Sequence, residues 1–411
     1  MFSSRFFKLA FAVLVSTPLV LQADDWPHWR GPNHDGHSAE TGLLKSWPDE
    51  GPALKWMTKG LGGGYSAPAV VKGKIYGMGY RGDDEVAWAY DAASGKEVWS
   101  VKLGPANREI DYSEGPRATP AVDGDRLYVL GLGGNLVCLS TDGKISWQKD
   151  LNKDLGGEMM SEWGYSESPL VDGDKVVCMP GGGQGTVAAL DKTTGKVLWR
   201  SADLKDTAAY TSLVPVELGG KRQYVALTGE TLAGVEAASG KILWKAERAG
   251  RTAVVPTPVV KDGEIWASSG YGVGSHMFEV KVDGGKFSAE EAYASRSLKN
   301  DHGGAIRIGD HVYAASGPAF VCMEMKTGKI AWKARSVGNG SLTYADGHLY
   351  LRGERGPIAL IEPNPEKYIE KSRFDQPDRS EAKSWAHPVI SDGVLYLRDQ
   401  NLLLAYDIKA K

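Results

Sequence analysis

The sequence has few cysteines, no excess of charge of one sign and no long helical segment. Only three of its 411 residues are cysteine, and an odd number argues against a complete disulfide framework. Each cysteine lies in an apolar run, where small buried thiols are common. The net charge is −3, which argues against the basic surface of a nucleic-acid-binding protein. No stretch longer than a turn or two has the 3.6-residue periodicity of a helix.

The N-terminal 23 residues have the pattern of a secretory signal peptide. Arg5 and Lys8 precede an apolar run over residues 9–15, and a small residue, Ala23, ends the segment. The run is short for a membrane span of about 20 residues, although an uncleaved anchor is the alternative. No cysteine near Ala23 offers a site for lipid attachment. We therefore expect a periplasmic or secreted protein without a membrane span, whose net charge after cleavage is −5 because two cations are lost.

Glycine is abundant, with 52 residues against a usual share of about 7%, and much of it belongs to a repeat. One motif reads AYDAASGKEVW at 89–99 and ALDKTTGKVLW at 189–199. A glycine followed by lysine recurs at positions 95, 143, 195, 240, 285 and 328, in steps of 43 to 52 residues, although the copy at 280–289 is degenerate. Internal repeats of this length indicate an array of similar structural units.

A second motif, typified by ATPAVDGDRLYVLG at 118–131, precedes each copy of the first. Its Asp-Gly turns between apolar runs predict β-hairpins, so each unit has four short antiparallel strands. Such units predict an all-β fold, an eight-bladed β-propeller of four-stranded antiparallel blades. Seven blades is the alternative if residues 340–384 are irregular. A parallel solenoid fits the hairpin turns less well.

The ends of the chain are expected to complete one blade together. Residues 402–409 supply a third strand but no tryptophan-bearing fourth strand, and the segment ending at Trp56 has the missing pattern. Closure removes two exposed sheet edges. The expected domains are a signal peptide over 1–23, an N-terminal arm over 24–55 and a propeller over 56–411. The propeller is closed by the strand near Trp56 and the C-terminal strands within 387–409.

The two motifs resemble the pyrroloquinoline-quinone (PQQ) repeat of quinoprotein alcohol-dehydrogenase-like propellers. The opening DDWPHWRGPNHDG at 24–36 is similar to the start of exported PQQ-like propeller proteins of environmental bacteria. The resemblance implies that the alanine, glycine and tryptophan of each repeat dock neighbouring blades. These positions correspond here to Ala89, Gly95, Trp99, Ala189, Gly195 and Trp199.

The phase of the repeat predicts a candidate site, because the segment that enters each blade faces the ring axis at one end. Aromatic rings with a few placed polar groups are typical of ligand pockets, and arginines suit carboxylates of a quinone or an acidic ligand. The alternative is that these side chains only fill the axial channel. The candidate residues are Arg117, Trp163, Tyr165, Glu167, Tyr210, Arg251, His302, Trp385 and His387.

Several other segments are assigned from their local pattern. Two insertions, 104–117 and 150–165, are adjacent in repeat phase and are expected on one face, whereas 362–384 is expected to be an irregular blade edge. The acidic run at 83–85 is typical of a solvated turn. The histidines at 28, 34 and 37 lack the usual spacing of metal ligands, so residues near them are expected to form a capping arm.

The predicted function is non-catalytic: an exported binding or scaffolding protein that docks a ligand or a protein at the axial mouth. The alternatives are a PQQ-dependent oxidoreductase and a glycan-binding module. Quinoprotein dehydrogenases of the resembled family hold PQQ beside adjacent cysteines and calcium on acidic and asparagine side chains, and this chain has no adjacent cysteines. We therefore assign no cofactor, with PQQ and calcium kept for the oxidoreductase alternative. The expected partner is an envelope protein or a small molecule, with no nucleic acid, and the expected state is a monomer.

Overall fold

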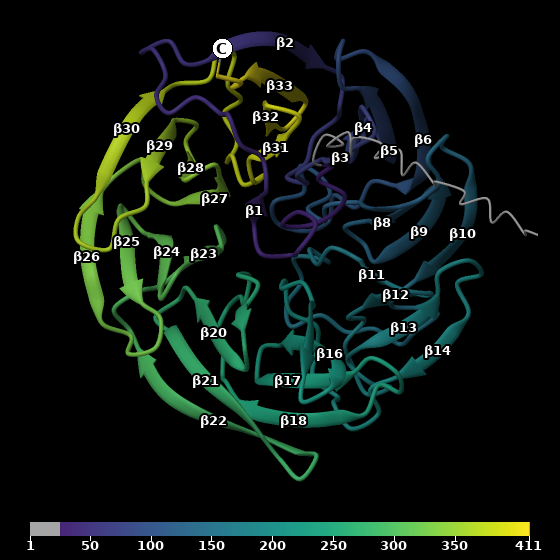
Figure 1. The fold of residues 1–411 in the computed structure, drawn as a ribbon. Helices are drawn as coiled ribbons and strands as arrows, with labels where there is room; N and C mark the ends of the chain where they lie inside the picture. Colours follow the sequence, from purple (N-terminus) through teal and green to yellow (C-terminus); the bar gives the residue numbers. More distant parts are fainter. Residues whose placement is uncertain (1–24, 411) are drawn as a thin grey trace, which may run out of the picture.

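The computed structural model describes residues 25–410, and the predicted signal peptide lies outside these residues. The described chain contains no helix and forms eight antiparallel sheets arranged as the blades of a ring (Figure 1). The prediction of an eight-bladed β-propeller is therefore confirmed. The segment 340–384 forms a regular seventh blade, so the seven-bladed alternative is wrong.

Each blade is a meander that runs from the ring axis outward. The first four blades are β3 (Ala69–Val71), β4 (Lys74–Arg81), β5 (Asp84–Asp91) and β6 (Glu97–Pro105); β7 (Ala121–Asp123), β8 (Arg126–Leu130), β9 (Asn135–Ser140) and β10 (Ile145–Asp150); β11 (Leu170–Asp172), β12 (Lys175–Cys178), β13 (Ala188–Asp191) and β14 (Val197–Arg200); and β15 (Val214–Leu218), β16 (Lys221–Leu227), β17 (Thr231–Glu236) and β18 (Ile242–Glu247).

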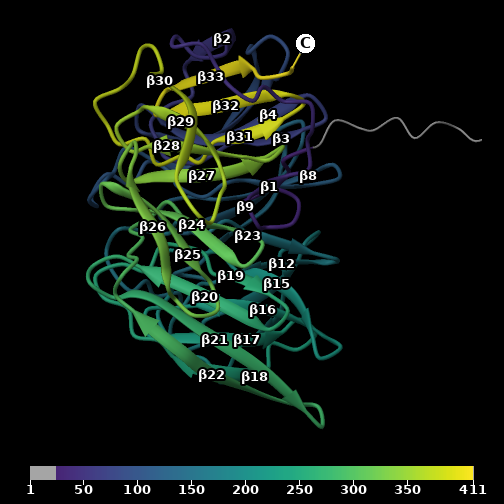
Figure 2. The same cartoon turned by 60° about the vertical axis from the view of Figure 1, so that its left-hand side comes forward.

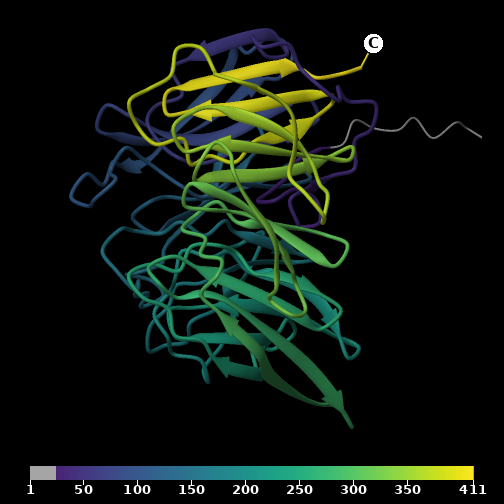
Figure 3. The same cartoon turned by 90° about the vertical axis from the view of Figure 1, so that its left-hand side faces the viewer.

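The fifth to seventh blades follow the same order. They are β19 (Val259–Lys261), β20 (Glu264–Ser269), β21 (Gly274–Asp283) and β22 (Lys286–Ser295); β23 (Ala305–Ile308), β24 (His311–Ser316), β25 (Ala319–Glu324) and β26 (Ile330–Arg335); and β27 (Gly340–Ala345), β28 (His348–Gly353), β29 (Ile358–Glu362) and β30 (Ile369–Phe374). The seventh blade gains a fifth strand, because β1 (His37–Ser38) pairs parallel with β27. The long β21–β22 hairpin projects beyond the ring (Figures 2 and 3).

The eighth blade joins the two ends of the chain. It contains β31 (Val389–Ser391), β32 (Val394–Asp399), β33 (Leu402–Asp407) and, at its outer edge, β2 (Ala53–Lys59). In the β2–β33 pair, Trp56 lies opposite Ala405. The buried Arg398 then ties this blade to the first one, donating to the carbonyls of Ser66 at 2.9 Å and Gly62 at 3.2 Å.

Burial explains why the strand sequences differ within a blade. The second and third strands are almost wholly buried, as in β8 and β9, because a neighbouring blade covers each of their faces. Their sequences are therefore continuous apolar runs rather than alternating ones. The fourth strands alternate between exposed and half-buried residues, as in β26. Cys138, Cys178 and Cys322 lie in second or third strands as free, buried thiols, as predicted.

The repeated tryptophan and glycine dock neighbouring blades. The indole of Trp147 in the second blade donates its N–H to the Lys192 carbonyl of the third at 3.2 Å. Gly195, in the left-handed region at φ +70°, lies against the same ring, and a Cβ there would come within 2.7 Å of it. The same indole bond recurs at Trp56, Trp99, Trp199 and Trp332. The docking role implied by the family resemblance therefore fits these contacts.

The degenerate repeat changes the seam between the fourth and fifth blades. Trp244 turns into its own blade and donates to Gln223 Oε1 at 2.8 Å. Gly285 lies at the corresponding turn of the fifth blade, but no indole packs on it: nothing lies within 4 Å of the position that a Cβ would occupy there. A cavity of about 210 Å³, lined partly by Trp244, remains between the two blades. At the next seam Tyr293 replaces the tryptophan, and its hydroxyl donates to the Met325 carbonyl at 2.7 Å.

Replacing Gly195 by alanine tests the docking contact. Gly195→Ala places a methyl group against the indole of Trp147, whereas the control Gly173→Ala, at φ +62°, meets open space. Both variants acquire left-handed backbone strain of about 1–2 kcal/mol. We expect Gly195→Ala to lower the free energy of unfolding by roughly 1–3 kcal/mol more than the control. Urea unfolding measures the difference, and equal losses would contradict the docking role.

Candidate functional site

The N-terminal arm crosses the middle of the ring and closes one end of the axial channel (Figure 1). It bonds to the innermost strands, or the segments entering them, of several blades. These contacts are Trp26 with Val70, Pro27 with Val122, Trp29 with Thr257, Arg30 with Ala305, and Gly36 with Tyr344. The arm therefore forms the floor of a blind axial cavity rather than a free tail.

Arg30 holds the arm in its folded path. Its guanidinium donates to the carbonyls of Asp35 and Ala305, both at 2.8 Å, and to that of His34 at 3.3 Å. Burial lowers the pKa of Arg30 to about 10, so the group stays charged at neutral pH. The rings of His28 and His34 stack at 4.0 Å. No group of His, Cys, Asp or Glu side chains within residues 25–410 is arranged to hold a metal ion.

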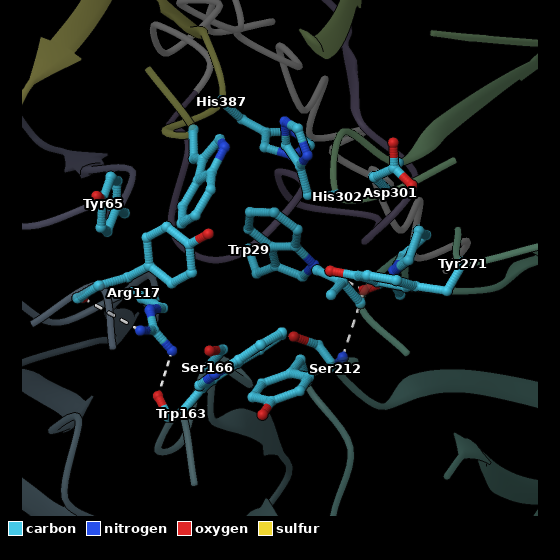
Figure 4. A pocket seen from close by; sticks show the side chains of 17 residues that line it. Trp29, Tyr65, Arg117, Trp163, Ser166, Ser212, Tyr271, Asp301, His302 and His387 are labelled. Carbon is cyan, nitrogen blue, oxygen red and sulfur yellow. Dashed lines mark hydrogen bonds between the residues drawn. The ribbon is translucent and has the colours of Figure 1, made fainter. Parts of the chain in front are cut away.

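Seven of the eight segments that enter blades line one cavity of about 170 Å³ (Figure 4). Its walls carry nine rings, and Trp29 of the arm lies at the centre of the close-up view. The ring-bearing residues are Trp29, Tyr65, Tyr112, Trp163, Tyr210, Tyr271, His302, Trp385 and His387. The smaller and charged lining residues include Arg117, Ser166, Ser212, Thr257 and Asp301.

The structure brings together six of the nine candidates from the sequence. They are Arg117, Trp163, Tyr210, His302, Trp385 and His387. The repeat phase therefore located part of the cavity wall. Whether these residues bind a ligand stays a prediction.

The other three candidates do not line the cavity. Tyr165 is buried between blades, where its hydroxyl donates to Asn152 Oδ1 at 2.9 Å. Gly164, at φ +77°, turns the chain between the two aromatic residues. The side chain of Trp163 therefore lines the cavity, whereas that of Tyr165 is buried outside it. Arg251 is exposed outside the cavity.

Glu167, the third of these, is buried, and its Oε1 accepts a hydrogen bond from the Met179 N–H at 2.5 Å. Glu85 behaves in the same way and accepts from the Leu132 N–H at 2.9 Å. The prediction of a solvated turn at 83–85 is therefore wrong for Glu85, which is 4% exposed within β5. Burial raises the pKa of Glu85 to about 7 and that of Glu167 to about 8.

Sequence reasoning missed several wall residues. Tyr112 lies in the insertion at 104–117, and its ring centroid is 6.1 Å from that of Trp163 in the other insertion. The expectation that both insertions rise on one face fits this contact. Tyr271 follows β20, away from the blade-entering segments, so the repeat phase did not include it. Asp301 immediately precedes the candidate His302 but was not itself chosen. Trp29 lies in the N-terminal arm, which was expected only to form a cap.

Six of the nine rings form one connected row of ring contacts along the wall, called the aromatic belt below. Trp385 contacts Tyr65 at 4.5 Å, Tyr112 at 5.1 Å and His302 at 5.5 Å between ring centroids. Trp163 lies 6.0 Å from Tyr210 at an interplanar angle of 30°. Aromatic pairs at these separations stabilise one another beyond their burial, so the belt is held in place before any ligand arrives.

Arg117 clamps the mouth loops instead of presenting a free charge. Its Nη1 donates to the Trp163 carbonyl, and its Nη2 donates to those of Asp111 at 3.1 Å and Tyr112 at 3.2 Å. The side chain thus joins the two insertions that carry Tyr112 and Trp163. Its Nε is buried and has no partner within the described chain.

The two histidines of the wall are neutral at pH 7. Burial, with Arg30 and His302 nearby, lowers the pKa of His387 to about 3. Burial also lowers the pKa of His302, although Glu354 and Asp301 oppose the shift. The remaining formal charges among the lining residues are those of Arg117 and Asp301.

Comparison with known proteins identifies the family. A family model described as outer membrane protein assembly factor BamB, a PQQ-repeat family, matches residues 82–334. The chain belongs to this family. A BamB of Shewanella oneidensis is 27% identical over 323 residues, which cover 76% of this chain and 68% of that protein. The predicted relationship to PQQ-repeat propellers is therefore confirmed.

Relatives of two kinds share the repeat. Quinohemoprotein alcohol dehydrogenase ADH IIB of Pseudomonas putida is 30% identical over 119 residues, which cover 27% of this chain and 16% of that enzyme. The crystal structure of BamB from Moraxella catarrhalis has a TM-score of 0.61 at 15% identity and covers 87% of this chain and 98% of that one. The quinohemoprotein alcohol dehydrogenase ADHIIG of P. putida has a TM-score of 0.65 at 14% identity, covering 94% and 81%. These structural matches show the fold alone.

The cavity of this BamB-family chain does not fit PQQ with calcium. The carboxylates of PQQ need cationic partners, yet both Nη atoms of Arg117 already donate to backbone carbonyls. Calcium takes roughly six to eight oxygen ligands, and the wall supplies one carboxylate, Asp301. Cys138, Cys178 and Cys322 lie apart and buried in blades, away from the cavity wall.

A retention experiment tests this misfit. We expect the chain from residue 24 onward, mixed with PQQ and calcium and then desalted, to retain no quinone absorbance. A quinoprotein dehydrogenase treated in parallel serves as the positive control. Retention of about one quinone per chain, lost in Arg117→Ala, would overturn the interpretation of the cavity wall.

Glu167→Gln tests the buried carboxyl group. Because the pKa of Glu167 rises from 4.5 unfolded to about 8 folded, the folded state holds a proton that the unfolded state loses. Stability therefore falls as pH rises from about 4.5 to about 8. The glutamine variant keeps the acceptor for Met179 but has no proton to lose. The free energy of unfolding of the variant should therefore fall less than that of the wild type over this window, by up to about 5 kcal/mol.

Urea unfolding at several pH values measures the effect of Glu167→Gln. Glu162→Gln, an exposed glutamate on the neighbouring loop, is the matched control and should follow the wild-type pH profile. Parallel profiles for all three proteins would contradict a buried, protonated Glu167.

Proposed function

We propose that this protein is a non-catalytic binding protein of the bacterial envelope that docks its ligand or partner at the axial mouth. The observation that carries the proposal is the blind cavity, whose ring-bearing walls come from almost every blade and whose floor is the N-terminal arm. Ligand sites of this kind are concave and mostly apolar, with a few placed polar groups.

The chemistry of the wall favours binding over catalysis. General acid–base catalysis needs a group whose pKa lies near the working pH and which reaches the substrate. The wall histidines are neutral, with a lowered pKa. The carboxyls whose pKa does lie near neutrality, Glu85 and Glu167, are buried outside the cavity. The quinone-dependent alternative is disfavoured by the misfit of the wall to PQQ.

Envelope localisation rests on the family and the N-terminal pattern. A curated relative that matches over 76% of this chain is described as an outer membrane protein assembly factor, and the first 23 residues have the pattern of a signal peptide. The part of the chain that the structure describes contains no helix long and apolar enough to cross a membrane. We infer that the protein works in the periplasm or outside the cell, as a monomer, with a mildly acidic surface unsuited to nucleic acid.

Site-specific photo-cross-linking tests docking at the mouth. Tyr112 and Tyr271 are 45% and 44% exposed and line the cavity, so a photoreactive residue at either position faces whatever enters. Val98, 49% exposed on the outer strand β6, is the control. We expect the same adduct from both mouth positions in intact cells of the host and none from Val98. No adduct from the mouth, or an identical one from Val98, would contradict docking there.

A further inference from the structure

The axial cavity has the size of one six-membered ring. Its volume is about 170 Å³, and an engineered protein cavity of about 150 Å³ holds one benzene molecule. The floor formed by Trp29 prevents a ligand from passing through the ring, because that indole is fixed by a 3.1 Å hydrogen bond to Thr257. Longer molecules can therefore insert one terminal ring and must leave the rest at the mouth.

The wall has no net charge with which to select a charged ligand. Arg117 is positive but donates to three backbone carbonyls. Asp301 is negative, accepts from the Asn339 amide at 3.2 Å, and lies so close to Gly270 that a Cβ there would come within 1.9 Å of its Oδ1. The two charges balance, and His302 and His387 add none. A neutral ligand suits this wall better than an anion or an ammonium group.

Several polar groups of the wall remain available for hydrogen bonds. The hydroxyl of Ser212 accepts from the Ser168 N–H at 3.0 Å, and that of Thr257 accepts from Trp29. Because a hydroxyl donates as well as accepts, both keep a proton to donate. Both hydroxyls can therefore donate to oxygen atoms of a ligand.

The aromatic belt supplies the complementary apolar contact. Aromatic faces carry partial negative charge, and the axial C–H groups of a pyranose ring carry partial positive charge. Trp29 at the floor and Trp163 and Trp385 in the walls are large enough to cover such a ring. Tyr112 contacts Trp163 and Trp385 and extends the surface on which a single ring stacks, whereas Tyr271 is exposed at the rim, where it can contact a second sugar unit.

We propose that the axial cavity binds the neutral terminal pyranose of an envelope glycan. The proposal rests on the proposed function and names the ligand class of that same cavity. The ring stacks within the aromatic belt, and its oxygen atoms accept hydrogen bonds from the hydroxyls of Ser212 and Thr257.

Titration with simple sugars tests the proposal. The probes are the methyl glycosides of glucose, galactose, mannose and N-acetylglucosamine, added to the chain from residue 24 onward. Binding is followed by tryptophan fluorescence and by saturation-transfer NMR, which reports contact with sugar protons directly. We expect at least one glycoside to bind saturably, and the same ligand to bind Tyr112→Ala about tenfold more weakly. Tyr112→Phe should restore most of the affinity.

A control and two competing probes make the outcome decisive. Phe287→Ala removes a half-buried ring from the projecting β21–β22 hairpin and should leave sugar binding unchanged. Tetramethylammonium binding in the absence of glycoside binding would overturn the proposal in favour of a cation cage. If no glycoside binds while the photo-cross-links at the mouth persist and are destroyed by protease, the glycan proposal fails and docking of a protein stands. Loss of the cross-links as well would refute the proposed function itself.

Discussion

The contact between one blade's tryptophan and the next blade's glycine turn is the interaction on which the ring depends. A four-stranded sheet leaves two apolar faces uncovered, and in a propeller each face is buried only by a neighbouring blade. The indole of Trp147 fixes this neighbour relation through a hydrogen bond to the Lys192 carbonyl and through close packing on Gly195. Because the glycine has a left-handed backbone and no side chain, the flat ring approaches the turn directly. The contact fixes the distance between neighbouring blades at four of the eight seams, and Tyr293 takes the place of the tryptophan at a fifth.

The candidate site is a consequence of that spacing. The ring leaves an axial opening, which the arm closes at one end and the entering segments narrow with aromatic side chains. Arg117 adds stiffness, since it binds the carbonyls of both long insertions. These hydrogen bonds to backbone carbonyls preorganise the mouth of the cavity before any ligand is present. A wall whose formal charges balance suits the proposed recognition of a neutral ligand better than recognition of a charged one.

The fold was predictable because its signals are periodic, whereas the site was predictable only in part. The eight copies of the second motif predicted eight blades, and the same phase located six wall residues. It failed at Tyr165 because the positive φ of Gly164 reverses the chain after Trp163, a local torsion that residue types alone do not reveal. The prediction for Glu85 had another basis, the run of three acidic residues, which is typical of a solvated turn. It failed because Glu85 is buried and accepts a hydrogen bond from the Leu132 N–H. Tyr112 and Tyr271 lie on loops outside the repeat, so no periodic argument could reach them.

The pairing of β2 with β33 orders the events of folding. The first complete strand after the arm forms its sheet with the last one, so contacts such as Gly62 with Asn401 join residues 339 positions apart. Blades one to seven can assemble from neighbouring hairpins as the chain lengthens, but the eighth cannot exist before the final residues are present. Contacts so distant in sequence carry the largest loop-closure entropy. Until closure, both the N-terminal strand and the third strand of the last blade expose unpaired edges. The arm shares this delay, because its anchor near Leu44 bonds to Ile408. Sealing of the ring and anchoring of the arm at Leu44 therefore both depend on the last strand, and a chain truncated before β33 would lack both.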